Sequence, residues 1–212
     1  MRTMSDRLGI FPLRTTSFKC FFGFDNSIDT YKVVMVDSNN DASKVRIFNS
    51  GDNIWREIED FPTNVYEDDG FCFRGTLNWL DENEIISLNL GIETCTKMLL
   101  PPGFDEVPHT DPHLALLMEC LCFCHDSKGT HFIIRKMMEF GITESWTQLL
   151  KVRYQDLHMY QIANNVPIHL SPLYIYNGVA VIFTSFDEDQ VIVYNMRDNR
   201  VERTRFTIEE KW

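Results

Sequence analysis

This 212-residue sequence has no long apolar run, little basic charge and no disulfide-type cysteine spacing. No stretch approaches the ~18 consecutive apolar residues of a membrane-spanning helix. The N-terminal residues 1–7 lead into polar sequence without the apolar core of a signal peptide. The six cysteines without framework spacing are typical of free thiols in a reducing compartment. We therefore expect a soluble protein of the cytoplasm, the nucleus or both, without a membrane partner.

Basic residues are outnumbered by acidic ones, 20 to 31, and the formal net charge is −11. Residues 52–111 alone hold fourteen acidic and three basic side chains. Because nucleic-acid binding relies on lysine and arginine neutralising phosphates, we expect no nucleic-acid partner. The acidic stretch either attracts a basic partner or consists of solvated loop residues. The second interpretation is preferred for the six acidic residues Glu57, Glu59, Asp60, Glu67, Asp68 and Asp69.

Residues that could perform catalysis or hold a metal are also sparse. Neither Gly-x-Ser-x-Gly nor a glycine-rich phosphate loop occurs. Cys120, Cys122 and Cys124 precede His125 and resemble a metal motif, but alternate positions on a strand place the thiols along one line, where they do not surround an ion. We interpret these cysteines as buried side chains and predict no catalytic residue, metal or cofactor. The other candidates, in or near proline-containing segments, are His109, Asp111, His113 and His169.

The sequence does contain a recurring six-residue spacing. An apolar strand ends at an asparagine, and a residue of the next strand follows six positions later. The three copies are Asn49 with Trp55, Asn89 with Cys95, and Asn195 with Val201, and a fourth runs from Phe140 to Trp146. The closing positions are 40, 51 and 55 residues apart, a period typical of propeller blades. We therefore predict an all-β protein of about four blades, each a three- or four-stranded antiparallel sheet.

Local patterns predict individual strands and turns. Strands are expected at 31–36, 44–49, 54–58, 71–80, 85–90, 94–100, 116–152 with a reversal at 126–129, 173–176, 179–183 and 191–195. One helix is considered at 111–119, because Asp111 could cap it and Pro112 could begin it.

Tryptophan and arginine give two further expectations. Trp55, Trp79 and Trp146 lie inside predicted strands, which favours packing between blades over a binding role. The last hairpin carries four arginines that either oppose the acidic stretch, bind a partner or form a solvated strand face, and the solvated face is preferred. They are Arg197, Arg200, Arg203 and Arg205.

Three motifs carry a resemblance to a known family. They are Phe22-Gly23-Phe24-Asp25 with Asp29–Val34, then Arg74–Leu80, then Glu139–Thr147. In order and spacing these motifs resemble the plant F-box-associated type 1 domain, the C-terminal module of F-box/kelch-repeat proteins. With Ile192–Asn195 the resemblance covers about residues 20–206. It implies a kelch-like, F-box-associated β-propeller at 21–208, after an N-terminal extension or loop at 1–20.

The resemblance also implies a function. It indicates a non-enzymatic interaction module that resembles the substrate-recognition domain of an SCF-type ubiquitin ligase F-box protein, with a target protein as its partner. In the family, an F-box and an early blade come first, and neither is recognised in these residues. We therefore expect an incomplete propeller that contacts the Skp adaptor and cullin only through an F-box outside this sequence.

Two alternatives stay open: a ligase-uncoupled fragment or decoy that binds targets, and a propeller-fold enzyme. The partner-binding residues are unknown at this point. Because ligand specificity in such scaffolds usually lies in loops, the longest irregular connections are candidates. These are 60–70, 101–113 and 153–170.

Overall fold

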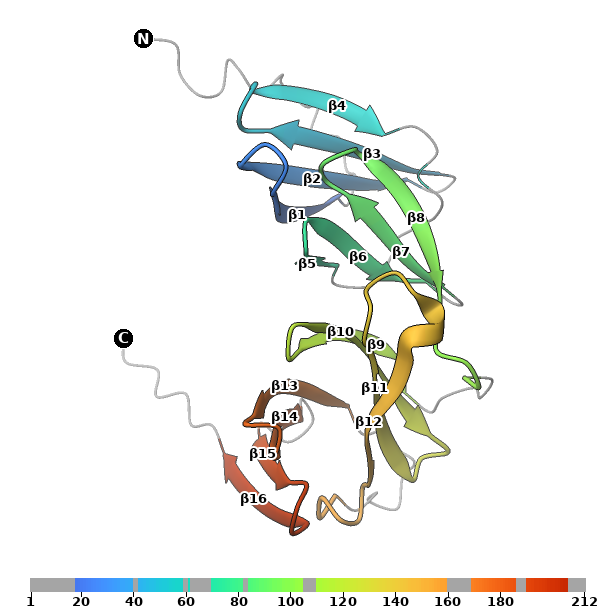
Figure 1. Ribbon diagram of the computed structural model, residues 1–212, viewed down its shortest axis with the longest axis vertical. Helices are drawn as coiled ribbons and strands as arrows, with labels where there is room; N and C mark the ends of the chain where they lie inside the picture. Colours follow the sequence, from blue (N-terminus) through green and yellow to red (C-terminus); the bar gives the residue numbers. More distant parts are fainter. Residues whose placement is uncertain are drawn as a thin grey trace. The chain divides into compact units, whose positions relative to one another are not determined.

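The computed structural model describes residues 18–39, 42–58, 61, 70–81, 84–104, 110–159, 169–185 and 190–205. The strands in these ranges form four four-stranded sheets, and in each sheet the strands follow one another in chain order (Figure 1). The paired registers are antiparallel. This confirms the predicted all-β fold with about four blades, whereas its incompleteness stays a prediction. No helix in the described part of the chain is long and apolar enough to cross a membrane.

The first sheet contains β1 (Phe18–Asp25), β2 (Thr30–Asn39), β3 (Ala42–Asn49) and β4 (Ile54–Ile58). The second contains β5 (Phe71–Phe73), β6 (Thr76–Leu80), β7 (Glu84–Asn89) and β8 (Thr94–Leu99). The third contains β9 (His113–Leu117), β10 (Cys120–Ser127), β11 (His131–Met137) and β12 (Trp146–Arg153). The fourth contains β13 (Leu170–Tyr176), β14 (Ala180–Ser185), β15 (Gln190–Asn195) and β16 (Arg200–Arg205).

The chain divides into two compact units, each with its own core. The first unit is Met1–Asp81 with Ile86–Thr96, and the second is Glu82–Ile85 with Lys97–Trp212. In the first unit, Val34 and Ile47 on one face of the first sheet belong to the same buried cluster as Leu77 and Leu88 of the second sheet. Alternation of buried residues with partly buried ones over residues 45–49 of β3 explains this face, because successive strand residues point to opposite sides.

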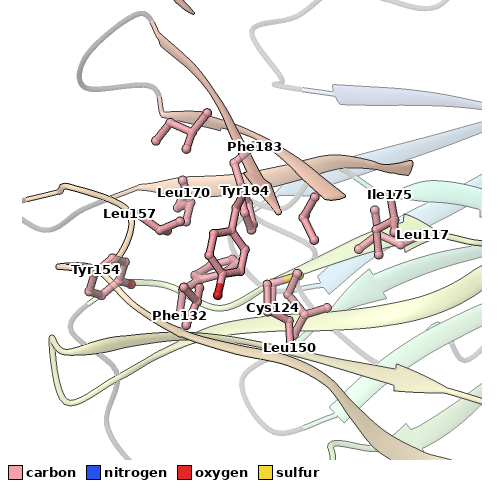
Figure 2. Close-up of a cluster of buried hydrophobic side chains, with 14 of the residues drawn as sticks. Leu117, Cys124, Phe132, Leu150, Tyr154, Leu157, Leu170, Ile175, Phe183 and Tyr194 are labelled. Carbon is pink, nitrogen blue, oxygen red and sulfur yellow. The ribbon is translucent and has the colours of Figure 1, made fainter. Parts of the chain in front are cut away.

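The core of the second unit lies between the third and fourth sheets. Figure 2 shows Cys124, Phe132 and Leu150 from the third sheet close to Phe183 and Tyr194 from the fourth. The rings of Phe132 and Phe183 meet edge to face with centroids 5.8 Å apart, a geometry that aromatic quadrupoles favour. Strand β10 is buried along most of its length on both faces.

The repeated asparagine has a structural reason. The side-chain oxygens of Asn49, Asn89 and Asn195 each accept a hydrogen bond, at 2.8–2.9 Å, from the backbone N–H two residues later. Such Asx turns reverse the chain. Four positions after each asparagine, a residue adopts positive φ: Asn53 (61°), Glu93 (54°) and Asn199 (55°). The second residue of the returning strand therefore falls six positions after the asparagine, which confirms the predicted spacing.

The prediction of a fourth copy of this spacing, from Phe140 to Trp146, is wrong. Strand β11 ends at Met137, three residues before Phe140, and the connection to Trp146 contains the 3₁₀ turn η2 (Thr143–Ser145). Gly141 has φ of +88° there, a value that glycine adopts without the steric cost of a Cβ atom. A phenylalanine has no side-chain acceptor, so Phe140 cannot close an Asx turn and the connection is longer.

The helix considered at 111–119 is also wrong. His113–Leu117 form strand β9, which pairs with β10 in the register Leu117 to Cys120. Met118 and Glu119 make the tight turn, both with positive φ (51° and 56°). Pairing with a central, buried strand outweighs the helix-start signal of Asp111 and Pro112, which is only a local preference.

Candidate functional site

Four turns of the first unit meet at one end of its strands. They are residues 26–29, 50–53, 74–75 and 90–93, which we call the turn cluster. The backbone N–H of Leu90 donates to the carbonyl of Gly75 at 2.9 Å, and that of Ser50 donates to the carbonyl of Tyr31 at 3.1 Å. Gly91 lies so close to Ser27 that an added Cβ would stand 3.2 Å from its hydroxyl oxygen. Turns from the first two sheets therefore form one continuous surface.

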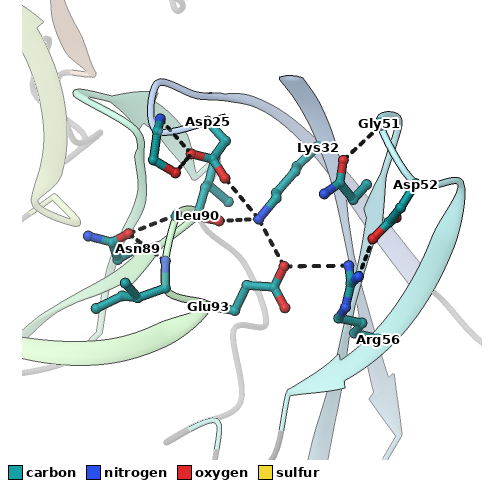
Figure 3. Close-up of polar contacts among 12 residues, drawn as sticks. Asp25, Lys32, Gly51, Asp52, Arg56, Asn89, Leu90 and Glu93 are labelled. Carbon is teal, nitrogen blue, oxygen red and sulfur yellow. Dashed lines mark hydrogen bonds and ion pairs between the residues drawn. The ribbon is translucent and has the colours of Figure 1, made fainter. Parts of the chain in front are cut away.

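The buried Lys32 on β2 holds the turn cluster together. Its side chain is 2% exposed, and its Nζ lies 3.0 Å from Oδ2 of Asp25 and 2.8 Å from Oε1 of Glu93. The ammonium also donates to the carbonyl oxygen of Leu90 (Figure 3). A buried charge is tolerated only when paired and hydrogen-bonded. The lysine thus ties the β7–β8 turn of the second sheet to the β1–β2 hairpin of the first.

The ionisation of this buried pair follows from its contacts. Burial acts to raise the pKa of Asp25, but hydrogen bonds from Ser27 and Lys32 offset it and hold that pKa below the ordinary aspartate value. Burial acts to lower the pKa of Lys32, whereas hydrogen bonds to Glu93 and Asp25 keep it above the ordinary lysine value. Both groups are therefore charged near neutral pH.

The exposed part of the turn cluster carries both charged and apolar side chains. Arg56 forms an ion pair with Asp52, and its Nη1 lies 3.9 Å from Oε1 of Glu93 (Figure 3). Ile28, at 53% exposed, and Ile92, at 71%, project from two of the turns. A surface that carries both exposed apolar and charged side chains resembles protein interfaces, which combine an apolar centre with a polar rim. The arrangement therefore suits binding of another protein.

The loops expected to bind a partner are other segments of the chain. Residues 60–70, 101–113 and 153–170 connect β4 to β5, β8 to β9, and β12 to β13. Much of each loop falls outside the described residues, so their binding role stays a prediction. The described portions include packing residues: Phe61 stacks edge to face on Trp79, and Phe104 does so on Phe123, with centroids 5.6 and 4.9 Å apart.

The turn cluster itself was not predicted as a site. The sequence signal that could have identified it is the Asx turn recurring at Asn49 and Asn89, because identical turns at equivalent strand ends meet at one edge of adjacent blades. Asp25 takes the same role in the β1–β2 hairpin, where its Oδ1 accepts from the N–H of Ser27 at 2.9 Å.

Cys120, Cys122 and Cys124 lie at alternate positions of strand β10, as their spacing predicts. Cys122 and Cys124 are buried on one face of β10 within the second core, and Cys120 is partly exposed. Burial raises the pKa of Cys122 to about 12 and also raises that of Cys124. Protonated thiols are poor nucleophiles and poor ligands. The described residues contain no group of three His, Cys, Asp or Glu side chains placed to hold a metal, and the absence of a metal stays a prediction.

The described histidine candidates lie in the second unit, and His113 is opposite Cys124 on the neighbouring strand. His125 is buried, with its Nδ1 3.0 Å from the carbonyl oxygen of Asp126 and its ring edge to face with that of Phe104. His113 faces Phe132, and burial together with the nearby His169 lowers its pKa to about 4. Asp111 is exposed. His109 lies outside the described residues.

Two of the three predicted core tryptophans are buried. Trp79 is 1% exposed and contacts Phe21, and Trp146 is 7% exposed with its indole N–H donating to the carbonyl of Leu99 at 3.3 Å. The prediction for Trp55 is wrong. It is only partly buried and packs on Phe48, on the face of the first sheet that points away from the core.

The charged residues singled out in the sequence differ in their surroundings where the structure describes them. Arg203 donates to the carbonyl of Leu157 at 2.7 Å and to the side chain of Gln190 at 3.2 Å, so it is a packing residue. The exposed members of that set are Arg197, Arg200 and Arg205. Glu57 lies 3.8 Å from Arg46. The other five acidic residues expected to be solvated, Glu59, Asp60, Glu67, Asp68 and Asp69, lie outside the described residues.

Comparison with known proteins agrees with this architecture. The family model described as the F-box associated beta propeller domain matches residues 10–212. An F-box/kelch-repeat protein of Arabidopsis thaliana is 28% identical over 166 residues, which cover 70% of this chain and 45% of that protein. The chain therefore spans less than half the length of this curated relative.

Proposed function

This chain belongs to the F-box associated β-propeller family, and we propose that it is the substrate-recognition module of an SCF-type ubiquitin ligase. Such domains are the substrate-binding modules of F-box proteins. The observation that carries the proposal is the family match over residues 10–212, on four antiparallel sheets. In this role the chain holds a target protein, and ubiquitin transfer is performed by other subunits.

The turn cluster is the surface we assign to target binding. Its base is fixed by the buried Lys32, so the turns present a surface that needs little ordering when a partner binds. Ile28 and Ile92 offer apolar contacts, and Arg56 and Glu93, which lie 3.9 Å apart, add charged groups. The target accordingly presents an apolar segment with at least one charged neighbour. The loops at 60–70, 101–113 and 153–170 remain additional candidates.

No catalytic role is proposed. Among the described residues, the buried thiols of Cys122 and Cys124 have raised pKa values, and Asp52 and Glu93 of the turn cluster are engaged in ion pairs. Both features support a binding module over an enzyme. A ligase-uncoupled decoy uses the same target surface and differs only in the fate of the target, so it is separated by experiment.

The test compares the 212-residue chain with the same chain carrying an F-box fused at its N-terminus. Affinity purification with mass spectrometry from the source tissue is expected to recover the same target with both forms. The Skp adaptor and cullin are expected only with the fusion, together with increased ubiquitination of the target. A target bound equally by both forms but never ubiquitinated supports the decoy, and recovery of no reproducible target contradicts the proposal.

Variants locate the binding surface within that experiment. Ile28→Asp combined with Ile92→Asp is expected to reduce target recovery about tenfold or more, because a charge replaces each apolar contact. The matched control is Ile142→Asp, at a side chain 47% exposed in the β11–β12 connection of the second unit. Equal loss in the control, or none in the double variant, assigns target binding to another surface.

A further inference from the structure

The β5–β6 turn of the second sheet contacts both turns that carry the exposed isoleucines of the turn cluster. The carbonyl oxygen of Gly75 accepts a hydrogen bond from the N–H of Leu90 at 2.9 Å. A Cβ atom added to Gly75 would lie 3.2 Å from Nδ2 of Asn26. Arg74, the other residue of this turn, is exposed. Its guanidinium group therefore belongs to the surface that we assign to target binding.

The cations at the turn cluster differ in their partners. Lys32 and Arg56, on strands of the first sheet, form ion pairs with carboxylates of the first unit. Arg74 forms no ion pair with any residue that the structure describes. A guanidinium presents its N–H donors in a planar fork that matches the two oxygens of a carboxylate. Arg74 is therefore the cation that can bind a charged group of a partner without breaking a described ion pair.

A neighbouring aromatic ring orients this guanidinium. Cζ of Arg74 lies 5.1 Å from the centroid of the Phe73 ring, and Phe73 is itself buried in the first unit. A cation above an aromatic face is attracted by the negative potential of the ring. Because the buried ring is fixed, the arginine side chain loses less conformational freedom when a partner binds than a freely rotating one does.

The backbone of the β5–β6 turn does not require an arginine. Arg74 and Gly75 have φ values of 50° and 74°, and Asn177 and Gly178 in the β13–β14 turn have φ values of 49° and 66°. Hairpin turns with two positive φ values favour Asn-Gly, because asparagine tolerates this conformation better than a long side chain does. Residues held in such conformations gather at binding sites. The arginine is therefore better explained by what its side chain binds than by the turn.

We propose that Arg74 selects the target by binding the carboxylate of an aspartate or glutamate, next to an apolar residue that contacts Ile28 and Ile92. This inference rests on the proposed target binding and adds the sign of the charge that the target carries. The net charge of −11 and the exposed Asp29 favour a basic partner at long range. An arginine–carboxylate pair acts at contact, where paired N–H···O bonds fix its geometry, so the recognised segment is acidic although the whole chain attracts cations.

Selection of phage-displayed random dodecapeptides on the full 212-residue chain tests this inference. Peptides that no longer bind the double variant Ile28→Asp with Ile92→Asp are those that occupy the turn cluster. We expect them to be enriched in Asp or Glu next to an apolar residue. Arg74→Asn, which suits the positive φ, should lower their affinity about tenfold in fluorescence anisotropy. The matched control is Arg197→Asn, at an exposed arginine of the β15–β16 turn in the second unit, which should leave their affinity unchanged.

A double-mutant cycle shows whether Arg74 and the acidic residue of the peptide are direct partners. Replacement of that acidic residue by its amide should weaken binding to the unmodified chain about tenfold. The same replacement should not weaken binding to Arg74→Asn further, because the contact is already lost. Arg74→Glu should reverse the preference, so that selection on this variant enriches Lys or Arg in place of Asp or Glu.

The outcomes separate this inference from the proposed function. Peptides that depend on the two isoleucines but lack acidic enrichment, or that bind Arg74→Asn equally well, overturn the role of Arg74 and leave target binding by the turn cluster intact. Recovery of no peptide that depends on the isoleucines contradicts the turn cluster as the binding surface, and the inference fails with it. Circular dichroism establishes that each variant is folded. If Arg74→Asn is not, Arg74→Gln and the amide form of the peptide decide the question.

Discussion

Lys32 is buried inside the first unit, and its side chain is only 2% exposed. Its ammonium group contacts Asp25, Glu93 and the carbonyl oxygen of Leu90. Lys32→Met should lower the free energy of unfolding by about 3–5 kcal/mol, because it leaves Asp25 buried without its cation. The control Lys97→Met removes a more exposed ion pair with Glu84 and should cost less than about 1 kcal/mol. Denaturant unfolding measures both, and equal effects would show that burial does not distinguish the two lysines.

His113 makes the second unit sensitive to acid. Burial and the nearby His169 lower its pKa to about 4, whereas an unfolded histidine titrates near 6.5. Between these values the unfolded chain binds more protons than the folded one, so the contribution of His113 is complete above about pH 6.5 and is lost as pH falls toward 4. The size of this loss is on the order of 3 kcal/mol.

His113→Phe should therefore flatten the stability profile between pH 6.5 and 4, as followed by thermal melts. His131→Phe, at a histidine whose Nδ1 lies 2.8 Å from the Thr130 hydroxyl, serves as control and should retain the slope. A slope that persists in His113→Phe assigns the acid sensitivity to another group.

At the scale of elements, the turns that follow Asn49, Asn89 and Asn195 could be predicted from the sequence. The longer β11–β12 connection, where Phe140 stands in place of the asparagine, could not. Strand β4 begins and ends where the sequence pattern placed it, at Ile54–Ile58, because Asn49 and the turn after it fix the strand start. Strand β1 was missed, since Phe21, Phe22 and Phe24 put apolar side chains on both faces and remove the alternation. The segment 71–80 contains an unrecognised turn at Arg74 and Gly75, where both residues have positive φ.

Trp55 shows why an equivalent repeat position does not guarantee equivalent burial. It occupies the same slot as Cys95 in the second sheet, and Cys95 packs against the first core. In the first sheet this slot lies on the side of the sheet that points away from the core, opposite Phe48. Local spacing specifies the side of a strand, but whether that side is covered depends on neighbouring sheets, which the sequence pattern does not specify.

The Asx turn also gives a prediction for a single element. Asn89 accepts hydrogen bonds from the N–H groups of Gly91 and Ile92 at 2.8 and 3.2 Å. Asn89→Ala leaves both donors without this acceptor and should destabilise the first unit by about 1–2 kcal/mol. Thr94→Ala, at an exposed position on β8, should change stability by less than about 0.5 kcal/mol. Urea unfolding compares the two, and a neutral Asn89→Ala would show that water replaces the side chain.

At the scale of the whole molecule, the fold was more predictable than the site. Periodicity and the three motifs were sufficient for an all-β propeller of about four blades. The turn cluster required tertiary information, because Lys32 and Glu93 are 61 positions apart in the chain and meet only after two sheets pack.

The two cores predict how the whole molecule unfolds. Each buried cluster draws its side chains from one unit, with Trp79 in the first and Phe183 in the second. Removal of either large side chain should cost about 3–5 kcal/mol. In repeat architectures stability depends mainly on a repeat and its neighbours, so the loss should stay local. We therefore expect Trp79→Ala to accelerate native-state hydrogen exchange at Val34 and Ile47 while Ile134 and Ile192 keep their protection, and Phe183→Ala to do the reverse. Uniform acceleration at all four amides in both variants would establish a single cooperative unit, and the two cores would then be parts of one folding transition.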